Sequence, residues 1–276
     1  MVQFRSGMPF DIPARIVRHE PLNPDHFLLT LLAPPIARAA RPGQFVMLRT
    51  RAGHEPLLRR PMSVHRVLPG RRELQILYKI VGGGTRYLSA QAPGTAIDTL
   101  GPLGRGFGPP GRGETPILVA GGIGIAVFPF LVEDLLRRRR RPTLLFGARG
   151  RRDLVGLSWY RGRRVPVRVA TEDGGLGHRG LVTALLEPIL RNRPGGTGDG
   201  GRPHLYVCGP TPMLRAVRAL ALEAGVPCQL ALESQMPCGI GVCLGCVVRR
   251  PENAGPVPYP RVCTEGPVFA AEAVEP

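Results

Sequence analysis

Four cysteines near the C-terminus have a residue type and spacing that suit iron–sulfur chemistry. They follow the pattern C-x4-C-x2-C-x16-C, at Cys238, Cys243, Cys246 and Cys263. Glycines separate the first three, at Gly239, Gly241 and Gly245. This is the plant-type spacing of a [2Fe–2S] cluster, in which four thiolates hold two irons. Because a loop around a cluster needs the left-handed backbone and close approach that glycine permits, the pattern predicts a carrier of single electrons.

Zinc and disulfides are the two alternatives for these cysteines. Zinc sites commonly use paired C-x2-C units or mixtures of cysteine and histidine, whereas this pattern has a single C-x2-C. Disulfides need an oxidising compartment, and residues 1–30 contain no basic segment followed by an apolar segment and a cleavage site. The spacing therefore favours a cluster over zinc, and both over disulfides, in a cytoplasmic protein.

The basic character of the chain does not by itself indicate nucleic-acid binding. The net charge is +17, but the basic residues are scattered, and Lys79 is the only lysine among 37 basic residues. The one run, Arg137–Arg141, precedes Pro142, where a predicted helix would end and place cations at its negative terminus. No nucleic-acid partner is expected, and binding to an acidic surface of a partner protein is left as an alternative.

One uncharged stretch, at 115–132, has the length of a membrane span. It contains Gly121, Gly122, Gly124 and two prolines, which interrupt a spanning helix. We expect instead a buried strand at 116–120, a glycine turn and a helix to about Arg141, in a soluble protein without a membrane span.

Three units are predicted along the chain. Residues 1–108 carry short apolar runs separated by turn residues, at 14–17, 27–32, 44–48, 61–67 and 74–81, which is typical of a small antiparallel barrel. Residues 109–232 alternate strands at 116–120, 143–147, 165–170, 204–208 and 228–232 with helices at 124–141, 180–191 and 211–224. That alternation favours a parallel sheet with helices on both faces, and 192–202 is a predicted loop. The fold class is multi-domain, with the cysteines on a third unit, 233–276.

Two motifs in the barrel half suit a cofactor that carries phosphate. Arg60-Pro61-Met62-Ser63 includes an arginine that can hold a diphosphate through paired hydrogen bonds, and Leu77-Tyr78-Lys79 follows it. Gly82-Gly83-Gly84-Thr85 leads into a predicted helix at 85–91, which Thr85 would cap, so its N-terminus is a predicted anion site.

Two further motifs suit a dinucleotide. Ala120-Gly121-Gly122-Ile123-Gly124 follows a predicted strand and opens a predicted helix, the context in which glycines bind dinucleotide phosphates, although the full G-x-G-x-x-G is missing. Tyr206-Val207-Cys208-Gly209-Pro210 ends a later strand, and open α/β sheets bind ligands at such strand ends.

The choice between NAD and NADP depends on the end of the second α/β strand, at Phe146-Gly147-Ala148-Arg149. Three arginines there could hold a 2′-phosphate: Arg149, Arg151 and Arg152. Asp153 could instead accept a hydrogen bond from a 2′-hydroxyl, and the residues leave both choices open.

In this order, the motifs resemble the ferredoxin–NADP reductase superfamily. With the C-terminal cysteines, the chain is similar over about 10–265 to the electron-transfer subunits of class 1B dihydroorotate dehydrogenases. Further similar stretches are Pro42-Gly43-Gln44-Phe45, 100–107, Thr171-Glu172-Asp173-Gly174 and 238–243. Two positions depart from the superfamily, since Met62 stands where many members have an aromatic residue and Val127 where many have proline.

The resemblance implies cofactors and the residues that hold them. FAD is expected on the barrel at Arg60, Pro61, Met62, Ser63, Leu77, Tyr78, Lys79, Gly84 and Thr85. NAD is expected on the α/β unit at Gly121, Gly122, Gly124, Cys208 and Gly209. The [2Fe–2S] ligands are expected at Cys238, Cys243, Cys246 and Cys263.

The resemblance also implies a function in de novo UMP synthesis. An FMN-containing catalytic subunit would oxidise dihydroorotate, and electrons would cross the cluster and FAD to reach NAD⁺. No residue of this chain is expected to act as a catalytic acid or base. The partner would bury Ile240, Val242 and Leu244 in a heterotetramer of two plus two, although each of these residues could instead pack within its own domain. The alternative is another NAD(P)H-linked flavin and iron–sulfur oxidoreductase, using ferredoxin or sulfur compounds.

Overall fold

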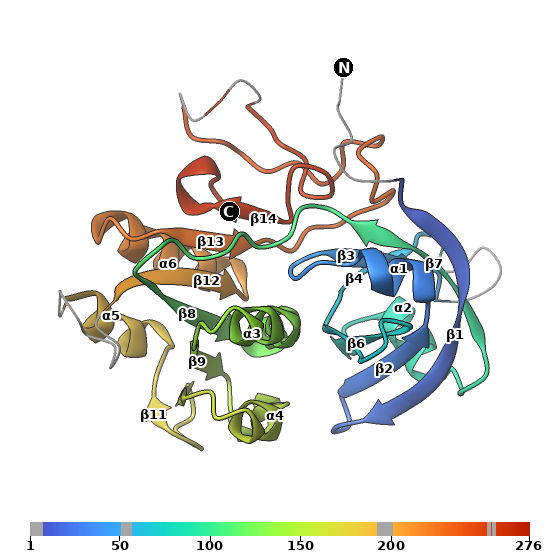
Figure 1. Ribbon diagram of the computed structural model, residues 1–276, viewed down its shortest axis with the longest axis horizontal. Coiled ribbons are helices and arrows are strands. Elements are labelled where there is room, and N and C mark those ends of the chain that lie inside the picture. The colour runs from blue at the N-terminus through green and yellow to red at the C-terminus, as the bar shows by residue number, and fades with distance from the viewer. Residues whose placement is uncertain (1–7, 51–56, 192–200, 253–254, 256–257) are drawn as a thin grey trace.

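Two sheets organise the chain (Figure 1). The computed structural model describes residues 8–50, 57–191, 201–252, 255 and 258–276, and within these ranges each sheet has seven strands. The first sheet is built from strands within residues 10–103 and the second from strands within residues 114–270, and the last segment of the chain lies across both. The predicted boundary at 108 falls between the two sheets, and the predicted boundary at 232 falls just after a strand of the second sheet.

The first sheet is antiparallel, with strand order β4-β3-β7-β1-β2-β6-β5. Its strands are β1 Phe10–Pro21, β2 His26–Leu32, β3 Phe45–Leu48, β4 Arg60–Ser63, β5 Arg66–Val67, β6 Glu73–Lys79 and β7 Ala96–Leu103. Buried and more exposed residues alternate along β7, as expected for a strand with one face on a core. Two short helices complete this half, α1 Pro34–Ala39 and α2 Gly83–Ser89. The predicted antiparallel barrel is confirmed.

The second sheet has the order β11-β10-β9-β8-β12-β13-β14 and is parallel except for its last strand. Its strands are β8 Glu114–Gly121, β9 Thr143–Ala148, β10 Val167–Thr171, β11 His178–Arg179, β12 Arg202–Cys208, β13 Cys228–Ala231 and β14 Val268–Ala270. The helices are α3 Phe128–Arg137, α4 Leu157–Gly162, α5 Thr183–Arg191 and α6 Thr211–Glu223, with 3-10 turns η1 Gly122–Val127, η2 Arg151–Asp153 and η3 Ala271–Ala273. Nearly every residue of β8 is buried, as expected for a strand covered on both faces. The predicted α/β fold is confirmed.

The helix after the glycine turn differs from the prediction of one helix over 124–141. The chain first forms the 3-10 turn η1, and the α-helix begins only at Phe128 and ends at Arg137. Arg139 has a left-handed φ of 58°, which an α-helix does not accommodate. Arg137 therefore ends the helix and the rest of the arginine run follows it. Arg137 and Arg138 both pair with Asp134.

The C-terminal segment packs against both sheets. Its strand β14 pairs antiparallel with β13 and so extends the second sheet. Cys246 and Cys263 share a core with Met47 and Leu103 of the barrel. The predicted loop at 192–202 lies outside the described residues up to 200, and β12 already begins at Arg202. Within the described ranges, no helix is long and apolar enough to cross a membrane.

Candidate functional site

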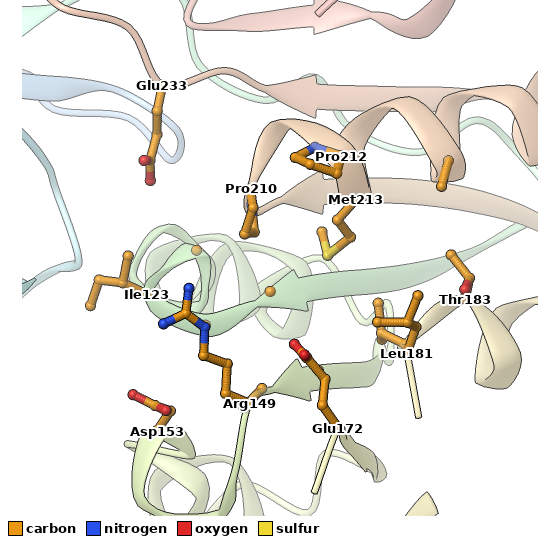
Figure 2. Close-up of a pocket in the computed structure, with 18 of the residues that line it drawn as sticks. Ile123, Arg149, Asp153, Glu172, Leu181, Thr183, Pro210, Pro212, Met213 and Glu233 are labelled. Carbon is orange, nitrogen blue, oxygen red and sulfur yellow. The ribbon is translucent and has the colours of Figure 1, made fainter. Parts of the chain in front are cut away.

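Two cavities lie next to each other where the sheets meet. The barrel cavity, about 580 Å³, is lined by β4, β6 and the segment 232–237. The sheet cavity, about 690 Å³, lies at the carboxyl ends of β8, β9, β10 and β12 (Figure 2). Four residues line both cavities: Lys79, Val81, Ile123 and Glu233. Ligands in the two cavities would therefore meet at this shared wall.

The barrel cavity collects most of the residues predicted to hold FAD. Eight of the nine line it: Arg60, Pro61, Met62, Ser63, Leu77, Tyr78, Lys79 and Thr85. Gly84 lies directly behind them, since a Cβ added there would collide with Nε of Arg60. A glycine at this position lets the arginine lie across the backbone.

The charge of Arg60 is not neutralised by a carboxylate among the described residues. Its guanidinium donates hydrogen bonds to the carbonyl oxygens of Leu58 and Arg59, at 2.5 and 3.5 Å. The neighbouring Arg59 is instead paired with Asp11, at 2.8 Å. An arginine in a cavity without an acidic partner suits an anionic ligand such as a diphosphate.

Tyr78 lines the barrel cavity and is held in place by Phe27 and His19, which do not line it. Its ring stacks on Phe27 at 5.7 Å, and its hydroxyl donates to Nε2 of His19 at 2.9 Å. Nδ1 of His19 donates to the carbonyl of Gln91 at 2.8 Å. Burial raises the pKa of Tyr78, so the phenol stays neutral. The wall that this side chain forms is rigid and uncharged.

The helix after the glycine run starts two residues earlier than predicted. Gly82 is its N-cap, and Thr85 lies inside the first turn of α2 rather than at the cap. Oγ1 of Thr85 accepts hydrogen bonds from the N–H groups of Val81 and Gly82, at 2.9 and 3.2 Å. Thr85 therefore caps the helix from within, because its hydroxyl satisfies amides that precede the helix.

The glycine turn forms one wall of the sheet cavity. The four glycines predicted to hold NAD line it: Gly121, Gly122, Gly124 and Gly209. Gly122 has a left-handed φ of 51°, and a Cβ on Gly121 would lie 2.6 Å from Sδ of Met213. At these glycines the backbone carries no side chain, which lets a phosphate approach the amides.

Cys208, also predicted to contact NAD, does not line the sheet cavity. It is 2 % exposed at the end of β12, and its carbonyl packs against Gly124 so closely that a Cβ there would clash. Burial raises the pKa of this thiol well above its usual value. The structure places it behind the cavity wall rather than in it.

Charged side chains from both halves surround the sheet cavity. Nζ of Lys79 lies 2.8 Å from Oδ1 of Asp153, so the barrel contributes an ion pair to the cavity of the other sheet. Lys79 lowers the pKa of Asp153 by this contact. Arg149, Glu172 and Glu233 also line the cavity, and burial raises the pKa of Glu233. The sequence patterns did not single out Glu233, which follows β13 and has no motif of its own.

Other contacts hold the two sheets together around the cavities. Arg152 pairs with Asp25 at 2.9 Å, and Nδ2 of Asn23 donates to the Arg152 carbonyl at 3.0 Å. The buried His65 donates from Nδ1 to the carbonyl of Ala126 at 2.8 Å, and burial lowers its pKa to about 4. The position of the sheet cavity relative to the barrel depends on these contacts.

The four predicted cluster ligands come together as two pairs. Cys238 is joined to Cys243, and Cys246 to Cys263, by a contact between a backbone N–H and a sulfur within each pair. Among the His, Cys, Asp and Glu side chains that the structure describes, no three are grouped so that they could hold a metal ion. Two thiol pairs fit a cluster with two irons, each held by two thiolates.

Backbone amides point at the sulfurs in this loop. Sγ of Cys238 accepts the N–H of Cys243 at 3.5 Å, and Sγ of Cys246 accepts that of Cys263 at 3.4 Å. Burial opposes ionisation of Cys238, but backbone hydrogen bonds outweigh it and bring its pKa down to about 6. Gly239 and Gly241 have left-handed φ values of 73° and 83°, as the sequence predicted, whereas next to the third glycine, Gly245, it is Leu244 that is left-handed, with a φ of 57°. The loop therefore stabilises the thiolate of Cys238, whereas burial raises the pKa of Cys263 to about 12.

An ion pair braces the cluster loop from outside. Arg261 contacts Glu265 at 2.6 Å and donates to the carbonyl of Gly241 at 2.9 Å. A Cβ on Gly241 would lie 2.8 Å from Thr264, so the loop and the 261–265 turn are in tight contact. The fourth cysteine lies in this turn, which explains how Cys263 reaches the others.

The cluster loop faces solvent on one side and the barrel cavity on the other. Three apolar side chains between the cysteines are exposed, Ile240 by 39 %, Val242 by 76 % and Leu244 by 60 %. None of the three therefore packs fully inside its own domain. The four residues 234–237, just before Cys238, line the barrel cavity. The loop thus connects an exposed apolar face to that cavity.

Known sequences resemble this chain along nearly its whole length. Residues 233–275 match the family described as the iron–sulfur cluster binding domain of dihydroorotate dehydrogenase B. A protein of Desulforamulus reducens, named dihydroorotate dehydrogenase B (NAD(+)), electron transfer subunit, is 38 % identical over 256 residues, 93 % of this chain and 95 % of the relative. A protein of the same name from Shouchella clausii is 34 % identical, over 92 % of this chain and 94 % of the relative.

Solved structures show the same architecture. The NADH-dependent reduced ferredoxin-NADP oxidoreductase, studied for flavin-based electron bifurcation, is 29 % identical with a TM-score of 0.81, over 95 % of this chain and 90 % of that one. The ferredoxin reductase in carbazole 1,9a-dioxygenase is 21 % identical with a TM-score of 0.66, over 79 % of this chain and 67 % of that one. The second likeness concerns the fold alone.

Proposed function

The chain belongs to the family of electron-transfer subunits of dihydroorotate dehydrogenase B, an NAD-linked oxidoreductase of pyrimidine biosynthesis, and from this premise we propose its electron path. Cys238, Cys243, Cys246 and Cys263 would hold a [2Fe–2S] cluster that receives electrons from the FMN of a catalytic subunit. The barrel cavity would hold FAD, and the sheet cavity NAD⁺ as the final acceptor. The family also implies a dihydroorotate dehydrogenase catalytic partner.

The serial arrangement of the three sites carries this proposal. Residues 234–237 line the barrel cavity and lead directly into Cys238. Four other residues that line this cavity, Lys79, Val81, Ile123 and Glu233, also line the sheet cavity. A flavin in the middle position accepts electrons singly and delivers them in pairs, which is the conversion that a cluster and NAD⁺ require.

Residues of the barrel cavity would hold FAD by charge and shape. Arg60, without a carboxylate partner among the described residues, supplies a cation for the diphosphate, and Gly84 with Thr85 closes the wall beside it. Tyr78 supplies a fixed aromatic wall, and Met62 a thioether where many relatives of the superfamily have a ring. No proton transfer by a side chain of this chain is needed, so no catalytic acid or base is assigned.

The cluster loop would bind the catalytic subunit. Ile240, Val242 and Leu244 are exposed around the cysteines, and a cluster passes electrons only to a redox centre that comes close. We assign the covering surface to the FMN-containing subunit, in a heterotetramer of two plus two. The functional division is a FAD unit at 1–108, a nicotinamide unit at 109–232 and a cluster unit at 233–276. All described cysteines are free thiols, which fits a reducing, cytoplasmic setting.

A second candidate is reduction or oxidation of ferredoxin. The solved NADH-dependent reduced ferredoxin-NADP oxidoreductase is similar over 95 % of this chain, which favours this alternative over other electron partners. The two functions share the cofactors and differ in the protein that contacts the cluster loop.

Co-expression with the catalytic subunit tests the proposal. The two chains should co-purify, and the complex should reduce NAD⁺ with dihydroorotate, whereas this chain alone should oxidise NADH with an artificial dye but not dihydroorotate. Dihydroorotate oxidation by the isolated chain, or a complex that reduces ferredoxin but not NAD⁺, would contradict it. The second outcome would favour the alternative.

A further inference from the structure

A carboxylate at the end of β10 lies in the sheet cavity without a partner. Glu172 directly follows β10 and lines this cavity (Figure 2). Its carboxylate makes no hydrogen bond and no ion pair within the part of the chain that the structure describes. A charged group held in a cavity without a partner is available to a ligand.

The turn that carries Glu172 is fixed by its neighbours. The N–H of Glu172 donates to the carbonyl of Ala148 at 3.1 Å, and that of Asp173 donates to the carbonyl of Arg149 at 3.1 Å. Oγ1 of Thr171 bonds both the N–H and the carbonyl of Leu176, at 3.1 and 2.9 Å. Glu172 is therefore held beside the end of β9 and does not swing with a loose loop.

Glu172 lies at the end of the cavity away from the barrel. In the sheet order, β10 is separated from β13 by β9, β8 and β12, so the two strand ends are about 19 Å apart. Glu233 follows β13 and lines both cavities, whereas Glu172 lines the sheet cavity alone. A dinucleotide whose nicotinamide meets the flavin would thus place its adenosine end near Glu172.

Asp153, the acidic group that follows β9, is already engaged. Its carboxylate forms the ion pair with Lys79 at 2.8 Å, which ties the barrel to η2. Arg149 lines the cavity beside both acids, and its guanidinium makes no hydrogen bond among the described residues. This part of the cavity therefore has one free carboxylate, which would repel a phosphate, and one arginine, which would attract it.

We propose that Glu172 is the residue that selects NAD over NADP, by accepting hydrogen bonds from the adenosine ribose hydroxyls and repelling a 2′-phosphate. This rests on the proposed binding of a nicotinamide dinucleotide in the sheet cavity. Charged hydrogen bonds are stronger than neutral ones, and two anions in one cavity repel each other. With Glu172 neutralised, Arg149 would be left to attract the phosphate.

Equilibrium binding to the full chain tests this, with FAD and cluster loaded and fully reduced beforehand so that neither nucleotide can pass a hydride to the flavin. Isothermal titration with NADH and NADPH should show that E172Q binds NADH about five-fold more weakly and NADPH about ten-fold more tightly. Adenosine 5′-monophosphate and its 2′-phosphorylated form should show the same reversal, since they carry only the adenosine end. Glu172→Asp, which keeps the charge, should retain the rejection of NADPH.

Asp173→Asn is the matched control. Asp173 carries the same charge one residue further on, but it does not line the cavity and its carboxylate accepts the N–H of Gly175 at 2.8 Å. This variant should leave the NADH-to-NADPH affinity ratio unchanged. An unchanged ratio in E172Q with normal NADH binding would overturn the role of Glu172 alone, as would an equal change in the control. If the parental chain binds neither nucleotide, the proposed nicotinamide site fails, and this inference with it.

Discussion

The cluster loop and the sheet cavity draw their residues from very different lengths of chain. Three of the four cysteines lie within 238–246, and the loop is shaped by its own glycines and amides and by contacts from the nearby 261–265 turn. The sheet cavity instead combines Lys79 of the barrel with four strand ends and Glu233. A local site depends on the residues in its own loop. A site assembled from distant segments also depends on how two domains stay docked, so changes far from it should alter it.

The largest effect is expected in the local site. Cys243→Ser should abolish cluster binding, because one iron loses one of its two thiolates, and should leave FAD bound in the separate barrel cavity. Iron content and visible absorbance measure the first, and flavin released on heating measures the second. Cys228→Ala, a buried cysteine outside the pattern, is the control and should keep the iron. Loss of FAD together with the cluster would show that the two sites are not independent.

A smaller but still large effect is expected for the cation of the barrel cavity. Arg60→Ala should weaken FAD binding about ten- to a hundred-fold, since hydrogen bonds to a charged group contribute about 1.5–3 kcal/mol. The flavin retained after dialysis and the dissociation constant of the apoprotein for FAD are the measurements. Arg49→Ala removes an arginine that pairs with Asp98 on the surface and should bind FAD normally. Full flavin occupancy in dialysed Arg60→Ala would rule out this role.

The docking of the domains should depend on pH through His65. Its pKa is near 6.5 in the unfolded chain and about 4 in the folded one, so the unfolded chain takes up the proton first as pH falls. Stability should therefore fall between pH 6.5 and 4, by up to about 3 kcal/mol. Denaturant midpoints at several pH values measure this, with His65→Asn as the variant that should lack this part of the slope. Equal slopes in both proteins would refute it.

The smallest effect is expected from the ion pair that joins the cavities. Lys79 and Asp153 are each about a quarter exposed, so a double-mutant cycle with Lys79→Met and Asp153→Asn should give a coupling of about 1 kcal/mol in the free energy of unfolding. The exposed pair Arg191 and Glu187 serves as reference, with an expected coupling of about 0.3–0.5 kcal/mol. A coupling of zero for Lys79 and Asp153 would mean that this contact does not hold the domains together.

Much of the fold could be predicted because strands of the second sheet are short apolar runs between turn residues. β8, β9 and β12 fall where their sequences predicted them. The six-residue helices α1 and α4 were missed because they are too short for a helical period to show in the sequence. Helix α3 ends earlier than predicted because a single left-handed residue, Arg139, stops it, and an arginine gives no sign of that conformation.

By itself, the sequence determined which residues can form the cluster loop. A cysteine spacing and the left-handed glycines at 239 and 241 are properties of one short segment, so they could be predicted without knowing the fold. Only the tertiary structure decided which of two carboxylates in the sheet cavity, Asp153 or Glu172, remains free. Asp153 was the sequence candidate, yet Lys79, from a strand of the other domain, pairs with it and leaves Glu172 without a partner. Such pairing depends on the distance between residues remote in the chain, and that distance exists only after the two sheets have packed together.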